Sequence, residues 1–153
     1  MRRLFPVFFM IVALLALAGC AKTSKAPTED SEAAKSFEAP TDRGVVYLYR
    51  TGKAVGAAGT IEVKVNGQVA GGTGPSTFFR WELKPGSYTF YSITGEASAT
   101  VALQVEAGEV YFIEQSARLG ISSGRVNMKE VDTQKGQSMI ANMKLLVSAY
   151  VPE

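Results

Sequence analysis

Few side chains in this sequence can carry out covalent or acid–base chemistry. The 153 residues contain a single cysteine, Cys20, and no histidine. Without histidine the chain lacks the commonest general base and transition-metal ligand, so Ser-His-Asp and Cys-His mechanisms are excluded. A single cysteine also excludes an intramolecular disulfide and a metal site built from cysteines. The folded chain must therefore be stabilised by its hydrophobic core.

Cys20 closes an N-terminal segment that has three zones. Residues 1–3 are positively charged, residues 4–17 are apolar apart from one proline, and the two residues before Cys20 are small. This order is typical of a secretory signal peptide, and the apolar zone is too short for a membrane-spanning helix. We therefore expect residues 1–19 to be a signal peptide that ends at Gly19.

The last residues of this segment, Leu17-Ala18-Gly19-Cys20, resemble the lipobox of bacterial lipoproteins. The resemblance implies a diacylglyceryl group on the Cys20 thiol, cleavage before Cys20, and an acyl chain such as palmitate on the new amine. Two or three acyl chains hold a protein on a membrane far better than one. We expect this covalent lipid, and no other cofactor, on a protein of the cell envelope. If the host has two membranes, Ala21 favours the outer one, facing the periplasm.

The chain carries little net charge once this leader is removed. It has 16 basic and 14 acidic residues, and residues 1–19 include two arginines and no acid, so the remaining 134 residues carry 14 of each. A nucleic-acid footprint needs a basic stripe, which this sequence lacks. The expected partners are the membrane, through the lipid, and an envelope protein or glycan, but no nucleic acid.

Two further segments resemble functional motifs only superficially. Residues 71–74 are glycine-rich but lack the lysine and hydroxyl residue of a phosphate loop, so a connection between strands is favoured. Glu106 and Glu109 flank a turn with no third oxygen-rich segment nearby, which argues against a calcium site. We therefore predict no catalytic residue and no metal site.

Two alternatives stay open. Glycan hydrolysis by carboxylates requires two acids about 5–10 Å apart in one cleft. The acids within predicted strands are Glu62, Glu82 and Glu114, and their alternation with apolar residues predicts exposure to solvent. The other alternative is a carrier that holds a small molecule or a lipid in a cavity inside the domain.

Aromatic residues are dense for a domain of this size and could form a binding platform. In consecutive pairs such as Phe78-Phe79, the two rings point to opposite faces of a strand. Packing in the core is favoured, because aromatic side chains dominate small cores. If some rings are exposed instead, the candidate binding surface is Trp81, Phe79 and Tyr49. Trp81 is the first residue to mutate, because tryptophan is over-represented at binding hot spots.

The elements that must position these residues are mostly β-strands. From residue 45 the chain shows runs of β-branched and aromatic residues, several of which alternate between apolar and polar. Asn66-Gly67 is the strongest hairpin signal, and Lys84-Pro85-Gly86 predicts a type II turn with positive φ at Gly86. This spacing is typical of an antiparallel β-sandwich of about seven strands. The runs are residues 45–50, 61–65, 68–70, 77–83, 87–93, 99–105, 110–115 and 125–131.

The two ends of the chain after the leader depart from this pattern. Residues 137–147 place apolar side chains at helical spacing, which predicts one C-terminal amphipathic helix packed on the sheet. Residues 20–43 begin with the lipidated Cys20 and are poor in large apolar groups, which predicts a flexible tether of about 25 Å. The sandwich domain, residues 44–153, is expected to fold alone.

Four motifs of turns and core strands stand out in this chain, and they are VVYLYR at residues 45–50, VKVNGQ at 63–68, ELKPGSYTF at 82–90 and VEAGEVYFIEQ at 105–115. On these motifs the chain resembles an uncharacterised family of bacterial lipoproteins with a domain of unknown function. Their turns and strands are similar to those of PEGA-like and carboxypeptidase-regulatory-like β-sandwiches. The resemblance implies a fold and brings no catalytic residue with it. We therefore expect a non-enzymatic, membrane-anchored module that binds or scaffolds a partner.

Overall fold

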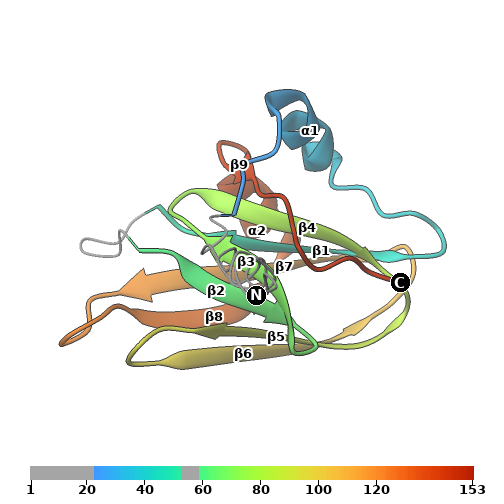
Figure 1. Cartoon of the computed structure of the whole chain (residues 1–153). Coiled ribbons are helices and arrows are strands. Elements are labelled where there is room, and N and C mark those ends of the chain that lie inside the picture. Colours follow the sequence, from blue (N-terminus) through green and yellow to red (C-terminus); the bar gives the residue numbers. More distant parts are fainter. Residues whose placement is uncertain (1–22, 53–58) are drawn as a thin grey trace, which may run out of the picture.

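The predicted runs of β-branched and aromatic residues all form strands (Figure 1). The computed structural model describes residues 23–52 and 59–153. The strands of this part are β1 (Gly44–Arg50), β2 (Ile61–Val65), β3 (Gln68–Thr73), β4 (Thr77–Leu83), β5 (Gly86–Ile93), β6 (Ser98–Val105), β7 (Val110–Arg118), β8 (Arg125–Val131) and β9 (Lys144–Leu145). The helices are α1 (Thr28–Ala33), the 3-10 turn η2 (Ala34–Ser36) and α2 (Thr133–Ile140). A mainly β fold with a helix near the C-terminus is confirmed.

The strands are arranged in two sheets. One sheet has five strands in the order β8-β7-β1-β4-β9, and the other has four in the order β3-β2-β5-β6. Most neighbouring strands are antiparallel, but β1 runs parallel to β7 and β4 runs parallel to β9. Both parallel pairs join segments far apart in the sequence, so no local pattern could predict them.

Strand β1 lies in the middle of the five-stranded sheet and is buried on both faces. All seven of its residues are buried. Val46 and Leu48 contribute to the core between the sheets, whereas Val45, Tyr47 and Tyr49 pack on the opposite face. A strand with two buried faces is continuously apolar instead of alternating, which explains the dense apolar run at residues 45–49.

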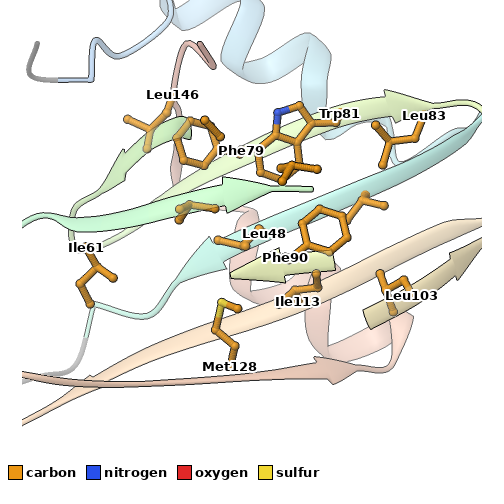
Figure 2. Packing of buried hydrophobic residues seen from close by; sticks show 14 of the residues in the cluster. Leu48, Ile61, Phe79, Trp81, Leu83, Phe90, Leu103, Ile113, Met128 and Leu146 are labelled. Atoms are coloured by element: carbon orange, nitrogen blue, oxygen red, sulfur yellow. The ribbon is translucent and has the colours of Figure 1, made fainter. Parts of the chain in front are cut away.

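The main core fills the space between the two sheets (Figure 2). Trp81 of β4 stacks on Phe79 with ring centroids 5.2 Å apart, and its ring lies 5.8 Å from that of Phe90 in the other sheet. Side chains from the inner faces of both sheets interdigitate, as is usual in a sandwich. The other residues labelled in Figure 2 are Leu48, Ile61, Leu83, Leu103, Ile113, Met128 and Leu146.

A second core lies on the outer face of the five-stranded sheet, beneath the helices. The rings of Tyr47 and Phe112 stack with their centroids 5.2 Å apart. Phe37, just after η2, packs on both, at 5.4 and 5.9 Å. Helix α2 adds Ile140 and lies so close to the sheet that the Phe112 ring leaves no room for a Cβ at Gly136. The fold therefore has three layers, which are the helices, the five-stranded sheet and the four-stranded sheet.

The segment that was predicted to be a flexible tether is packed on the folded domain from Thr23 onward. The Oγ1 of Thr23 accepts a hydrogen bond of 2.6 Å from the backbone N–H of Gly72 in β3. The carbonyl oxygen of Ser24 accepts one of 2.9 Å from the N–H of Val147. The first described residues therefore pair antiparallel with the C-terminal segment.

Helix α1 and the residues after it complete this attachment. Ser31 is fully buried, and its Oγ accepts a hydrogen bond of 3.0 Å from the N–H of Leu145. The hydroxyl of Tyr47 donates to the carbonyl oxygen of Ala34 at 2.6 Å, and Phe37 covers the Tyr47 ring. The tether prediction is therefore wrong for residues 23–43. It was based on the small number of large apolar side chains in this segment, and hydrogen bonds to distant segments cannot be read from composition.

The predicted turns are confirmed only in part. Asn66 and Gly67 have φ angles of 49° and 81°, as a two-residue hairpin turn requires. Gly86 has a φ of 156° and begins β5, so it does not take the third position of a type II turn, which needs a φ of about +80°. The glycine-rich residues 71–73 belong to β3 instead of connecting strands.

The C-terminal helix is shorter than predicted and starts earlier. Asp132 caps α2, because its Oδ1 accepts a hydrogen bond of 2.9 Å from the N–H of Lys135, and the helix ends at Ile140. The chain then forms β9 on the edge of β4. A single helix over residues 137–147 would place its apolar side chains in one core. In the structure Ile140 packs beneath the helices and Leu146 packs between the sheets, so the helix ends between them.

Candidate functional site

The three aromatic residues of the candidate binding surface are all buried. The exposed fraction is 2% for Trp81 and zero for Phe79 and Tyr49. Trp81 and Phe79 pack between the sheets, and Tyr49 packs on the outer face of the five-stranded sheet. The prediction of a binding surface at these rings is therefore wrong, and the core alternative is correct. Phe78 and Phe79 point to opposite faces as expected, but the fold covers both faces.

The lipidation and cleavage sites, Cys20 and Gly19, lie outside the described residues. Within residues 23–52 and 59–153, no helix is long and apolar enough to cross a membrane. The same described part of the chain holds no group of three or more Cys, Asp or Glu side chains placed to bind a metal ion.

The three strand acids considered for glycan chemistry do not meet in one cleft. Glu62 lies 3.4 Å from Lys64 in the four-stranded sheet, whereas Glu82 and Glu114 belong to the five-stranded sheet. There they flank β1 at positions four residues apart, because Glu82 pairs with Val45 and Glu114 pairs with Tyr49. Four residues of a strand span roughly 13 Å. That distance exceeds the range that a pair of glycosidase carboxylates needs.

Glu114 is part of an ion cluster that joins α2 to the sheet. Its carboxylate lies 2.8 Å from the Nζ of Lys135 and 3.6 Å from that of Lys129, and it accepts a hydrogen bond of 3.0 Å from the Tyr49 hydroxyl. Burial alone would raise the pKa of Glu114, but the hydrogen bonds from Lys135 and Tyr49 hold this pKa below its usual value. Burial and the adjacent carboxylate raise the pKa of Tyr49. These groups are therefore in their ordinary charge states and act in packing.

A buried polar cluster, which the sequence did not predict, lies where β1 ends. Gln115 donates a hydrogen bond of 2.8 Å through Nε2 to Ser92 Oγ, and its Oε1 accepts one from the Thr73 hydroxyl. Arg50 donates through Nη1 to the carbonyl oxygens of Thr73, at 2.8 Å, and Gly59, at 2.6 Å. The four side chains are buried and come from both sheets. The sequence offered one signal for this cluster, which is that the charged Arg50 ends an apolar run just before a glycine-rich loop.

A cavity of about 220 Å³ opens beside this cluster. Arg50 lines it together with Thr60, Thr94 and Ser123, and with glycine backbone. Burial lowers the pKa of Arg50, but a guanidinium still remains protonated at neutral pH. None of the described residues that line the cavity is acidic. The cavity therefore offers hydrogen-bonding groups and a positive charge, without a carboxylate to act as a general base.

The loop between β7 and β8 is held at the rim of this cavity by a carboxylate. Glu96 accepts hydrogen bonds from the backbone N–H groups of Ser122, of Ser123 at 2.7 Å, and of Ile121 at 2.9 Å. These hydrogen bonds lower the pKa of Glu96 to about 2. Successive backbone N–H groups of this kind form a nest that binds anions, and here a carboxylate of the chain occupies it.

The sequence that forms the two sheets matches a known family model. The model for a protein of unknown function (DUF2846) matches residues 40–129, which is more than half of the chain. The chain belongs to the DUF2846 family. An uncharacterized protein of Haemophilus influenzae is 26% identical to this DUF2846 protein over 148 residues, which is 96% of this chain and 88% of the other.

The DUF2846 match covers β1 to β7 and most of β8. The buried polar cluster and the residues lining the cavity lie within it. Residues 23–39, α2 and β9 lie outside it, and these are the segments that cover the outer face and one edge of the five-stranded sheet. The part matched by the DUF2846 model is therefore the two-sheet sandwich without β9 and the last two residues of β8.

Proposed function

We propose that this DUF2846 protein is a lipid-anchored protein of the cell envelope, whose domain is a non-enzymatic module that binds or scaffolds a partner. The observation that carries the proposal is the sequence Leu17-Ala18-Gly19-Cys20 at the end of a three-zone leader. It supports cleavage after Gly19 and lipidation of Cys20. Because Cys20 is the only cysteine, its thiol has no disulfide partner within the chain.

The site of residence that we propose is the outer membrane, with the domain facing the periplasm, in a host that has two membranes. The residue after the lipidated cysteine is Ala21. An aspartate at this position would resemble the signal that retains lipoproteins in the inner membrane. Fractionation of the two membranes tests this assignment, and recovery with the inner membrane would contradict it.

The surface that we propose for partner binding is the end of the sandwich around the cavity beside Arg50. Loops on a rigid scaffold are common binding sites. Leu119 and Ile121, in the loop held by Glu96, are 65% and 93% exposed. Exposed apolar side chains beside hydrogen-bonding groups suit an envelope protein or a glycan. The two-sheet architecture also supports the similarity to PEGA-like and carboxypeptidase-regulatory-like accessory domains.

The chemistry of the chain supports a role without catalysis. Histidine is missing from the sequence. Glu62 and Glu82 each lie within 3.4 Å of a basic side chain, and Glu114 is held by Lys135 at 2.8 Å. We propose no cofactor other than the covalent lipid.

The lipid anchor is tested by the substitution Cys20→Ser. Metabolic labelling with radioactive palmitate should label the wild-type protein and leave the variant unlabelled, because the hydroxyl does not replace the thiol in the lipid transfer. The variant Ser24→Ala, which lies beyond the lipobox, is the matched control and should be labelled like the wild type. Undiminished labelling of the Cys20→Ser protein would contradict the proposed anchor.

The binding surface is tested by crosslinking in living cells. A photoreactive residue at position 121 should yield a defined crosslinked product, whereas the same residue at Gln104, which is exposed on β6, should not. Gln104 lies near the end of β6 that is remote from the β5–β6 turn and Glu96. Identical products from both positions would contradict the assignment of the binding surface.

A further inference from the structure

We propose that the anchored domain lies directly on the bilayer, with the surface around Thr23 against the lipid headgroups. We call this the Thr23 surface, and it is formed by Thr23, Lys25, Val69 and Val147. The inference rests on the proposed lipid at Cys20 and adds to it the orientation of the domain.

The connection between the anchor and the folded domain is very short. Only Ala21 and Lys22 separate Cys20 from Thr23. Three residue steps of a fully extended chain span roughly 10 Å. A flexible tether over residues 20–43 would instead have placed the domain about 25 Å from the bilayer. A lipid on Cys20 therefore brings the Thr23 surface to the headgroups.

Thr23 is held tightly by the backbone of β3. Its Oγ1 lies 2.6 Å from the N of Gly72. At Gly71, whose φ is 135°, a Cβ would lie 2.7 Å from Thr23 Oγ1 and 3.1 Å from Thr23 Cγ2. This close approach depends on the missing side chain of Gly71. As long as this contact holds, Thr23 therefore stays within roughly 10 Å of the anchor.

The side chains of the Thr23 surface suit the boundary between acyl chains and headgroups. Val69 and Val147 are 47% and 54% exposed, and Lys25 is exposed. Val147 donates its N–H to Ser24, and Val69 precedes Ala70, to whose carbonyl oxygen the same C-terminal segment is hydrogen-bonded. Exposed apolar groups beside a lysine favour contact with an anionic bilayer.

The arrangement of the sheets decides which parts then remain accessible. The described N-terminal residues run beside β9, at one edge of the five-stranded sheet (Figure 1). Strand β8 forms the opposite edge of this sheet. The orientation therefore places β8, with Lys129, on the side of the domain away from the bilayer.

The orientation is tested by lysine footprinting of the lipidated protein. The purified protein is added to vesicles of phosphatidylcholine and phosphatidylglycerol and treated with an amine-reactive reagent that does not cross membranes. Mass spectrometry then gives the labelling rate of each lysine. Lys25 should be labelled several-fold more slowly than in the soluble, unlipidated chain of residues 21–153, while Lys129, whose side chain is 55% exposed, should be labelled at the same rate in both.

An insertion provides the matched control. A Gly/Ser segment of about twelve residues between Lys22 and Thr23 keeps the anchor and adds a flexible coil, so Lys25 should be labelled at the soluble rate. Equal labelling of Lys25 in the vesicle-bound lipidated protein and in the soluble protein would overturn the orientation and leave the anchor intact. A mass spectrum of the same sample that shows no lipid on Cys20 would overturn the orientation and the proposed anchor together.

Discussion

The indole Nε1 of Trp81 donates a hydrogen bond of 2.8 Å to the Oγ of Ser148. Ser148 lies in the segment after β9, and its own hydroxyl donates to the carbonyl oxygen of Tyr150 at 2.9 Å. The Tyr150 ring packs edge-on against Trp81, with centroids 6.4 Å apart. The C-terminal segment therefore closes the main core over the only tryptophan of the chain.

We predict that the fluorescence of Trp81 is blue-shifted and resists quenching by iodide, because only 2% of the side chain is exposed. The variant Ser148→Ala removes the acceptor of a buried N–H group and should lower the free energy of unfolding by about 1–3 kcal/mol. Ser138→Ala, at an exposed position of α2, is the control for urea titration. Red-shifted emission that iodide quenches in the folded wild type would contradict the burial of Trp81.

A second prediction is that residues 44–153 are less stable without residues 23–43, in contrast to the expectation that they fold alone. Removing residues 23–43 uncovers Tyr47 and Phe112, on which Phe37 packs. The shortened domain should bind a hydrophobic dye and unfold at lower urea concentration than residues 21–153. Phe37→Ala in the longer chain should cost about 1–3 kcal/mol because its ring is partly buried, whereas Glu38→Ala, at an exposed position, should cost little. Equal stability of the two chains would show that the segment is dispensable.

A third prediction concerns Gly136 in α2. Within a helix, Gly→Ala normally stabilises by about 1 kcal/mol. Here the Phe112 ring occupies the space that a Cβ would need. Gly136→Ala should therefore destabilise the protein by roughly 1–3 kcal/mol, which is typical of overpacking. Thermal unfolding measures the effect, with Gln134→Ala at an exposed position of the same helix as the control. A rise in melting temperature would mean that α2 does not press on Phe112.

A fourth prediction concerns the pH dependence of the loop between β7 and β8. The pKa of Glu96 is about 2 in the folded protein, against an ordinary value of 4.5. Because folding lowers this pKa, the stabilisation is complete above about pH 4.5 and is lost as the pH falls towards 2. Hydrogen-exchange protection of Ser122 and Ser123 should decrease over this range. Glu96→Gln should reduce this protection at neutral pH, and Glu130→Gln, at an exposed position of β8, should not. Unchanged protection in Glu96→Gln would argue against the nest.

Local patterns in the sequence determined strands β1 to β8, the Asn66-Gly67 hairpin and the presence of a helix near the C-terminus, but not β9. The physical reason is that side-chain alternation and turn dihedral angles act between residues close together in the chain. Strand β2 is an example, since its residues alternate between buried and half-buried as the sequence predicts. The lipobox at Cys20 is likewise a local motif, which is why the anchor can be proposed from the sequence.

Only the tertiary structure decided which surfaces are covered. Trp81 and Phe79 face the main core and Tyr49 faces the second core, so covering both faces of one sheet left none of them exposed. The pairing of Thr23 with Gly72 and the cluster around Arg50 join residues that are 49 and 23 positions apart in the sequence. Such contacts form because the folded sheets bring distant backbone groups together, and each buried polar group must then find a partner there.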